Sequence, residues 1–343
     1  MFLNDTEILI RKSNKDLSIL KLGNKIIYED NKLNLKETLV EELIENQYSF
    51  VDVYLDIDTD DNIYGIINDK KGKIFKINIQ EKKINKEVIF KYYYKDFHIK
   101  FPYIKKIQNK EHILYYSINK ENPYTSYLMH IYNSDGVIIK NKVDYIQYNI
   151  MSNFEVLWDE SLPILFYFKY INGCEELCVS IFNSYYNEWT KPFNITDSKK
   201  AKIYLNIIKD KHRNYHIVFS ENHEGKYHCK YIKGKFENNK FEIYESKTIK
   251  TNLMCLFPHL INHDNEIYIE WGEYDYVYTC KSSDLGSTWS NPVLKNKESN
   301  ISFRRYIFKS NYKEADKYIC STIFGSKDYE NIIVSRTPYN KMN

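Results

Sequence analysis

The stretch SSDLGSTW at residues 282–289 decides the fold of this 343-residue chain. It follows the pattern S-x-D-x-G-x-T-W with Ser282, Asp284, Gly286, Thr288 and Trp289. Serine and aspartate side chains can accept hydrogen bonds from backbone N–H groups of their own turn. Glycine permits a positive φ in such a turn, and a tryptophan ring can pack between sheets. The stretch therefore predicts a tight turn whose last residue is anchored in a β-rich core.

A repeat of about fifty residues contains this turn. Each copy holds a strand-like run, a polar turn and a second strand-like run. The copies begin at Asp61, Glu111, Leu162, Arg213, Asn265 and Asp316. An upstream run, such as 101–104 or 257–260, and a downstream run, such as 86–90, complete four short strands in a copy. Four strands in each repeat are typical of the blades of a β-propeller.

The repeat therefore predicts an all-β chain that forms one β-propeller domain over residues 1–343. The N-terminal stretch adds four further strand-like runs, so seven four-stranded blades are favoured. Six blades with an N-terminal extension are the alternative. Residues 32–46 alone have a helical composition, but their KETLV aligns with KEVIF one repeat later. This segment is predicted to be a strand with a long connection.

The motif at 282–289 resembles the Asp-box, or BNR repeat, family of β-propellers, which includes sialidases and several non-enzymatic propellers. A degenerate copy lies earlier in the chain, where Trp189 and Pro192 occupy the places of Trp289 and Pro292. The resemblance implies that the turn joins the third and fourth strands of a blade, at the end away from the ligand. The motif residues are then structural and take no part in binding.

Composition narrows the range of functions. The net charge is +3 with acids and bases interleaved, so no nucleic-acid surface is expected. No signal peptide or long apolar run is present in this sequence, so no membrane association is expected. The six cysteines form no CxxC pair, which fits reduced thiols and a cytoplasmic location. No cofactor is expected.

The arginine content argues against a sialidase. The resemblance implies three arginines that hold a substrate carboxylate, and an Arg-Ile-Pro motif near the N-terminus. That motif is absent, and the chain has only five arginines: Arg11, Arg213, Arg304, Arg305 and Arg336. Lysine replaces arginine poorly in bidentate carboxylate recognition. The scaffold is therefore expected without sialidase activity.

The resemblance implies that the ligand face is built by the loops from the fourth strand to the next first strand and from the second strand to the third, and the phase of the repeat locates these loops in the sequence. The candidate ligand-binding residues are His98, Tyr124, Tyr148, Glu221, Trp271, Glu273, Arg304 and Arg305. Their mixture of rings and polar groups suits a glycan or a peptide. Glu270 is the only acid at its repeat position and is the candidate general acid or base, if the protein is an enzyme.

Signals for a metal are weak. Asp56, Asp58 and Asp60 alternate as in the first part of a calcium loop. The glycine expected at the sixth position is missing, and Ile67 stands where a bidentate glutamate belongs. A solvated acidic turn is the favoured interpretation, and no metal is expected.

Three functional hypotheses remain open. The favoured one is a non-catalytic propeller that binds a glycan or a protein through its loop face. The alternative is a glycoside hydrolase on the same scaffold, and the third is a purely structural or assembly propeller. Fold alone does not choose among them.

Overall fold

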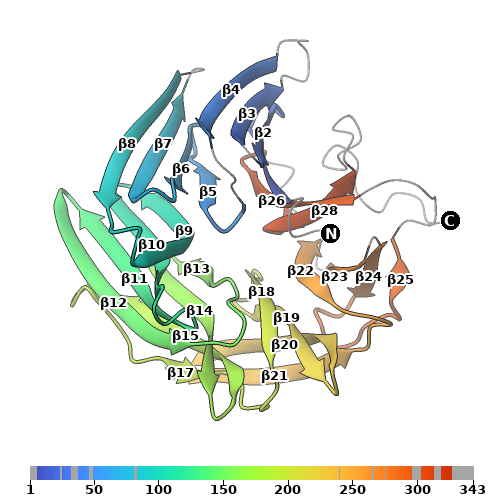
Figure 1. Cartoon of the computed structure of the whole chain (residues 1–343). Coiled ribbons are helices and arrows are strands. Elements are labelled where there is room, and N and C mark those ends of the chain that lie inside the picture. The colour runs from blue at the N-terminus through green and yellow to red at the C-terminus, as the bar shows by residue number, and fades with distance from the viewer. Residues whose placement is uncertain are drawn as a thin grey trace.

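The structure is a computed structural model. It describes residues 6–23, 25–31, 38–45, 49–80, 83–238, 240–264, 266–274, 276–295, 303–312 and 318–326. These residues form six β-sheets arranged as blades around a central axis (Figure 1). Within the described ranges, no helix is long and apolar enough to cross a membrane.

Blade 1 combines strands from both ends of the chain. It contains β1 (Thr6–Arg11), β2 (Leu17–Leu22), β3 (Lys25–Asn31), β4 (Thr38–Glu45), β26 (Phe303–Ser310) and β28 (Thr322–Ser326). Their order across the sheet is β28-β26-β1-β2-β3-β4. The prediction that residues 38–45 are a strand is confirmed, and the rest of segment 32–46 lies outside the described residues.

Blades 2 and 3 are regular four-stranded meanders. Blade 2 contains β5 (Val53–Ile57), β6 (Ile63–Asn68), β7 (Lys73–Gln80) and β8 (Lys83–Lys91). Blade 3 contains β9 (Phe97–Ile107), β10 (Lys110–Asn119), β11 (Thr125–Ser134) and β12 (Val137–Gln147). Each strand pairs antiparallel with the next, and the first strand lies nearest the axis (Figure 1).

Blades 4 to 6 repeat this plan with shorter outer strands in two of them. Blade 4 contains β13 (Glu155–Asp159), β14 (Leu162–Ile171), β15 (Cys174–Asn183), β16 (Glu188–Trp189) and β17 (Phe193–Asn194). Blade 5 contains β18 (Lys202–Lys209), β19 (Tyr215–His223), β20 (Lys226–Glu237) and β21 (Lys240–Ile249). Blade 6 contains β22 (Leu256–His263), β23 (Glu266–Glu273), β24 (Tyr276–Ser282) and β25 (Val293–Leu294), and β27 (Tyr318–Ile319) pairs with β22.

The favoured number of seven blades is wrong, and the alternative number, six, agrees with the described residues. The strands assigned to a seventh blade are shared between two sheets. β26 pairs in parallel with β1, from Thr6↔Arg305 to Arg11↔Ser310, and β28 pairs with β26. β27 joins blade 6 instead. Strands from the two ends of the chain therefore share one sheet, and the N-terminal strands form part of a blade.

The apolar core lies between the blades, because both faces of an inner sheet are covered by neighbours. β14 shows the period of two directly. Phe166 and Phe168 pack with residues of blade 5, whereas Leu165 and Tyr167 pack with residues of blade 3. A strand buried on both faces reads as a nearly continuous apolar run, as LPILFYF does from Leu162.

The turn at 283–292 joins β24 and β25, the third and fourth strands of blade 6. Asp284 accepts from the Thr288 backbone N–H at 2.8 Å and from its hydroxyl at 2.7 Å. Ser282 Oγ accepts from the Gly286 N–H at 2.7 Å, and Gly286 has a φ of 94°. The Trp289 ring packs edge-on against Tyr231, 4.8 Å between centroids. All the polar groups of Asp284 are thus used within its own turn.

Candidate functional site

Three strands nearest the axis carry an aromatic residue in the left-handed backbone region. Phe101 on β9, Tyr204 on β18 and Phe257 on β22 have φ values of 51°, 61° and 49°. Each stands where the pairing with the next strand shifts register. A positive φ in a non-glycine residue costs about 1–2 kcal/mol and is concentrated at functional sites. The same strained backbone conformation therefore occurs in blades 3, 5 and 6, so these three residues are candidates for a functional site.

The preceding blade holds two of these bulges in place. The Phe101 N–H donates to the Val51 carbonyl at 2.7 Å, and the Tyr204 N–H donates to Ser152 Oγ at 2.9 Å. Val51 and Ser152 lie in loops that enter the first strands of blades 2 and 4. The bulges are therefore fixed by inter-blade hydrogen bonds.

The guanidinium of Arg305 packs against Phe50 and Phe257, and these two rings contact those of Phe101 and Tyr204. Phe50 lies 6.0 Å from Phe101 and 6.3 Å from Phe257 between ring centroids, and Tyr204 lies 4.1 Å from Phe257. The Arg305 Cζ is 4.4 Å from the Phe50 ring centre and 4.1 Å from that of Phe257. Aromatic faces attract a guanidinium. We call these five residues the arginine cluster.

Arg305 is 9% exposed and only partly hydrogen-bonded. Its Nε donates to Thr6 Oγ1 at 3.1 Å. Its Nη2 is buried and has no hydrogen-bond partner among the described residues. Burial lowers the pKa of the guanidinium to about 10, so it stays charged at neutral pH.

Glu155 begins β13 and is the carboxyl group electrostatically linked to this arginine. Burial raises the pKa of Glu155 to about 7, although Lys309, Asn206, Arg305 and Asn153 all favour the charged form. Asn153 Nδ2 donates to Glu155 Oε1 at 3.2 Å. The side chain keeps intermediate exposure to solvent. Glu155 can therefore exist in either protonation state near neutral pH.

Lys309 on β26 links Glu155 to a row of tyrosines. Its Nζ donates to the Tyr54 hydroxyl at 2.8 Å, and the Tyr54 ring lies 4.6 Å from Tyr103. The Tyr103 hydroxyl accepts from Trp158 Nε1 at 2.8 Å. Side chains from β26, β5, β9 and β13 are thus joined in one series of contacts.

Asp56 on β5 is a second carboxylate influenced by Lys309. Burial alone would raise its pKa, but Lys309 and Lys105 outweigh burial and lower the pKa below its ordinary value. Lys105 Nζ donates to Asp56 Oδ2 at 2.8 Å. One lysine therefore lies near an ionised Asp56 and a Glu155 that titrates near neutrality. Two acids whose pKa values are pushed apart are typical of acid–base catalysis.

Glu270, the general acid or base that the sequence suggested, is buried within blade 6. It is fully buried on β23, with Lys295 Nζ 2.7 Å from Oε1 and His259 Nε2 3.4 Å from Oε2. Burial alone would raise its pKa, but Lys295 and His259 lower it to about 2. A carboxylate so strongly held in its ionised form is a weak proton donor at neutral pH. Its catalytic role stays a prediction, and a pKa of about 7 makes Glu155 the better candidate for a proton donor.

Three other predicted ligand residues are buried inside blades 5 and 6. Trp271 Nε1 donates to Glu273 Oε1 at 2.8 Å, and Glu273 Oε2 accepts from the Leu253 N–H at 3.0 Å. Glu221 accepts from Ser198 Oγ at 2.7 Å and pairs with His223 at 3.1 Å. These contacts bridge strands and loops within the scaffold.

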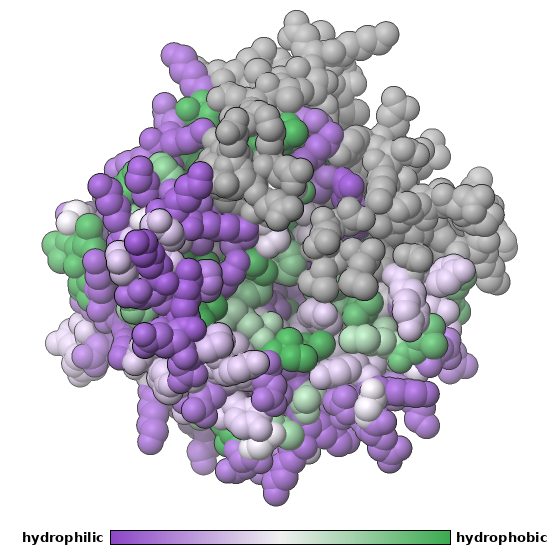
Figure 2. All heavy atoms as spheres, viewed as in Figure 1, coloured by the Kyte–Doolittle hydropathy of each residue, from purple (hydrophilic) through white to green (hydrophobic). Residues whose placement is uncertain are grey.

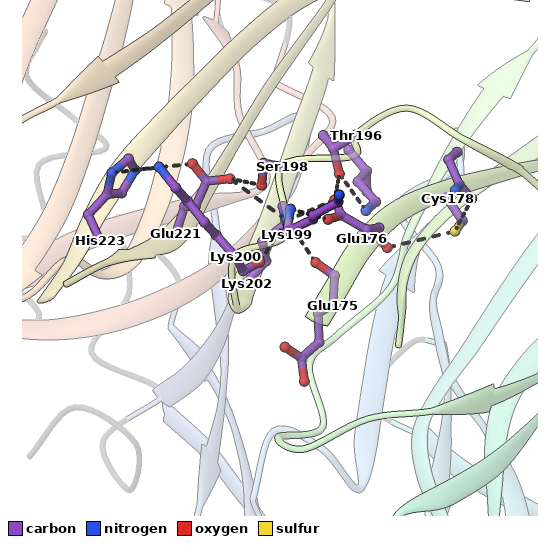
Figure 3. A network of polar contacts seen from close by, with 12 residues as sticks. Glu175, Glu176, Cys178, Thr196, Ser198, Lys199, Lys200, Lys202, Glu221 and His223 are labelled. Carbon is purple, nitrogen blue, oxygen red and sulfur yellow. Dashed lines mark hydrogen bonds and ion pairs between the residues drawn. The ribbon is translucent and has the colours of Figure 1, made fainter. Parts of the chain in front are cut away.

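Glu221 belongs to an ion-pair network between blades 4 and 5 (Figure 3). At its centre is Lys202, which is 0% exposed. Its Nζ lies 2.8 Å from Glu176 Oε2 and 3.8 Å from Glu221 Oε2, and donates to the Glu175 carbonyl at 2.8 Å. In Figure 3 the Glu175 carboxylate points away from this lysine. Lys202 on blade 5 is therefore bonded to two groups of blade 4 and links the two blades.

The remaining predicted ligand residues spread over one end of the blades. His98 and Tyr124 are exposed at the start of β9 and in the β10–β11 loop. Tyr148 is buried and donates to the Pro123 carbonyl at 2.9 Å. Arg304 pairs with Glu7. Of the eight predicted ligand residues, Arg305 lies in the arginine cluster.

The structure does not bring the alternating aspartates together. Asp56 turns to Lys105, whereas Asp58 accepts from the backbone N–H groups of Asp60 and Asn62 at 3.0 and 2.9 Å. Within the described ranges, no group of three His, Cys, Asp or Glu side chains is arranged to hold a metal. The turn is self-contained, and the calcium candidate gains no support.

In the face seen in Figure 2, hydrophobic residues gather toward the middle, and hydrophilic residues make up most of the described periphery. Sequence reasoning missed Glu155, Lys309 and the three aromatic bulges. The sequence does contain a feature that could have identified Glu155. It lies in the run FEVLWD at 154–159, which occupies the place of a blade's first strand, one repeat after FPYI at 101–104. Periodicity identifies that strand but does not show which inner residues face each other across the axis.

Comparisons with known proteins support the fold. No protein-family model matches the chain, and no curated protein matches its sequence. A PL25 ulvan lyase, a polysaccharide lyase, matches with a TM-score of 0.62 and 8% identity, over 96% of this chain and 91% of that chain. An α-L-arabinanase from Penicillium chrysogenum, complexed with arabinobiose, matches with a TM-score of 0.50 and 9% identity, over 80% of this chain and 93% of that chain.

These neighbours correct the favoured functional hypothesis. The sequence led us to expect a non-catalytic binding propeller, but the ulvan lyase and the arabinanase are both catalytic proteins that act on carbohydrates. They favour the enzyme alternative over that expectation. At these identities the likeness shows a shared propeller fold, and the Asp-box relationship gains no support from a family model.

Proposed function

We propose that the protein is a carbohydrate-active enzyme that hydrolyses a glycosidic bond at the central axis, with Glu155 as the proton donor. The observation that carries the proposal is a partly exposed Glu155 whose pKa is raised to about 7 by burial, although Arg305 and Lys309 favour its charged form. A general acid works best when its pKa lies near the operating pH. Glu155 is the described axial carboxyl that meets this requirement.

In the proposed reaction, Glu155 gives its proton to the glycosidic oxygen as the bond from that oxygen to the anomeric carbon breaks. Water adds to the anomeric carbon and restores a proton to the carboxylate. Hydrolysis of this kind uses two carboxyl groups in different protonation states. Asp56 is our candidate for the ionised partner, because Lys309 and Lys105 keep it charged.

The test is hydrolysis of a panel of neutral and acidic polysaccharides, measured as release of reducing ends. We expect Glu155→Gln to lower kcat on the active substrate by about 100-fold or more, the typical contribution of a general acid. Glu121→Gln is the matched control, since Glu121 is exposed in the β10–β11 loop. Formation of unsaturated products instead would assign the chemistry to elimination and contradict hydrolysis.

Folding must be separated from catalysis in this test. Glu155→Gln keeps a side-chain oxygen that can accept from Asn153 Nδ2, so the contact at 3.2 Å can persist. We expect the variant to unfold at a Tm within a few degrees of the parent. Equal activity of the parent and Glu155→Gln would remove Glu155 from the mechanism.

Several finer assignments also remain proposals. The internal hydrogen bonds of Asp284 and the packing of Trp289 support a relationship to Asp-box propellers. We also propose a single propeller domain over the whole chain, a glycan ligand and a cytoplasmic location, as the sequence predicts. A glycan ligand is favoured by the carbohydrate-active neighbours.

A further inference from the structure

The arginine cluster contains a buried donor that the protein itself does not use. Arg305 Nη2 has no hydrogen-bond partner among the described residues, although Nε is bound to Thr6 Oγ1. The rings of Phe50 and Phe257 lie over the guanidinium at 4.4 and 4.1 Å, and they supply no oxygen acceptor. Buried polar groups in folded proteins are nearly always paired, so an unpaired one calls for an explanation.

The neighbouring carboxyl group does not neutralise this arginine. In the part of the chain that the structure describes, Arg305 forms no ion pair, whereas Arg304 beside it pairs with Glu7. Glu155 titrates near neutral pH and is occupied by Asn153. Lys309, the other cation near Glu155, is hydrogen-bonded to the neutral hydroxyl of Tyr54. Arg305 and Lys309 are thus both close enough to influence Glu155, and the ionised carboxylate near Lys309, Asp56, is paired with Lys105 and not with Arg305.

The aromatic walls explain how a sugar could be held beside such a charge. Phe257 and Tyr204 lie 4.1 Å apart between centroids, and both are fixed by bulges in their strands. Phe257 is 6% exposed and packs against both Tyr204 and Arg305, so the partly exposed rings of Tyr204, Phe101 and Phe50 are the ones left to pack against a sugar. Phe50 is only partly buried and lies over the guanidinium beside Phe257, with 6.3 Å between the two ring centroids.

We propose that Arg305 recognises an anionic substituent, a carboxylate or a sulfate ester, on the sugar bound beside Glu155. A guanidinium offers paired donors that match the oxygens of either group, which an ammonium does not. The inference rests on the proposed function for the place of the sugar, and it adds the substrate class. A single arginine, flanked by rings, carries this recognition.

The experiment is affinity gel electrophoresis in three panels of polysaccharide: carboxylated (pectate, alginate, heparosan), sulfated (carrageenans, sulfated fucan) and neutral (arabinan, galactan, dextran). We expect retention by a carboxylated or sulfated polymer, and the retaining panel distinguishes the two sources of charge. Arg305→Lys, which keeps the charge, should weaken this retention at least tenfold in apparent Kd. Arg213→Lys is the matched control, because Arg213 has a 66% exposed side chain.

Phe50→Ala tests the same site without removing the arginine. Uncovering the guanidinium should strengthen retention by the acidic polymer, and this result does not depend on the folding of an Arg305 variant. Retention by neutral polymers only, or acidic retention that Arg305→Lys leaves unchanged, would overturn the inference.

Carrying out the gels in the Glu155→Gln background separates this inference from the proposed function. Arg305-dependent retention by Glu155→Gln, together with full catalytic activity of that variant, would sustain the anion site and reject the acid. Loss of activity in Glu155→Gln with retention only by neutral polymers would reject the anion site and support Glu155 as the acid.

Discussion

Lys309 donates a hydrogen bond from Nζ to the hydroxyl of Tyr54 at 2.8 Å, which joins β26 near the C-terminus to β5 near the N-terminus. The pair joins blade 1 to blade 2. The same lysine favours the ionised forms of Glu155 and Asp56. One side chain therefore links these two blades and influences both carboxyl groups of the proposed site.

Replacement of this lysine should change the pH dependence of catalysis. In Lys309→Met the positive charge that lowers the pKa of Glu155 is lost, so that pKa should rise above about 7. A general acid is active below its pKa, so the alkaline limb of the kcat profile should move to higher pH. The profile of Lys211→Met, in the β18–β19 turn, should match that of the parent. An unchanged limb in Lys309→Met would rule out this coupling.

The closure of the ring should depend on the packing of β26. Tyr306 is fully buried with Leu9 and Ile19 of blade 1. Tyr306→Ala should lower the free energy of unfolding by about 3–5 kcal/mol, as large-to-small changes in a core do. Tyr185→Ala should change it by less than about 0.5 kcal/mol, because Tyr185 is 85% exposed. Urea denaturation measures both, and equal effects would mean that β26 adds little.

Gly286, in the turn between β24 and β25, can be compared with Gly136, another glycine with a positive φ. A Cβ on Gly286 would lie 1.8 Å from the Tyr231 hydroxyl, whereas one on Gly136 would meet nothing within 4 Å. Both glycines have positive φ, of 94° and 87°. Gly136→Ala should lower the free energy of unfolding by about 1–2 kcal/mol. Gly286→Ala should lower it further, and equal values would show that Tyr231 moves freely.

Two histidines between blades 3 and 4 should make the protein sensitive to acid. Trp189 Nε1 donates to His130 Nδ1 at 3.0 Å, and His130 lies 3.1 Å from His112 Nδ1 through Nε2. With Nδ1 of His130 accepting, Nε2 carries the proton and donates to His112. Burial lowers the pKa of His112 to about 4 and that of His130 well below its ordinary value.

In the unfolded chain both histidines take up protons below about pH 6.5, and this uptake sets the direction in which stability changes with pH. The folded protein resists protonation, so stability should fall as the pH drops from about 6.5 to 4. The difference between a pKa of about 6.5 for His112 in the unfolded chain and about 4 in the folded protein corresponds to about 3 kcal/mol of this loss. Urea midpoints measured across this range should fall less steeply in His112→Gln. Parallel curves would contradict the account.

The sequence predicted the four-stranded unit because its alternation and turns are local. It did not predict the number of blades, since the pairing of β26 with β1 joins residues about three hundred positions apart. Arg305 was predicted from the phase of the repeat. Glu155 was missed because its environment comes from β18 and β26, which no local pattern places beside it. Glu270 was favoured for its unusual position, but burial with Lys295 explains that position equally well.

The central claim is that Glu155 transfers a proton to the leaving sugar. The most direct measurement is kcat for Glu155→Gln on the polysaccharide that the parent protein cleaves, beside the parent and Glu121→Gln. The account predicts a loss of about 100-fold or more in Glu155→Gln alone, with its Tm kept. A kcat for Glu155→Gln equal to that of the parent would contradict it.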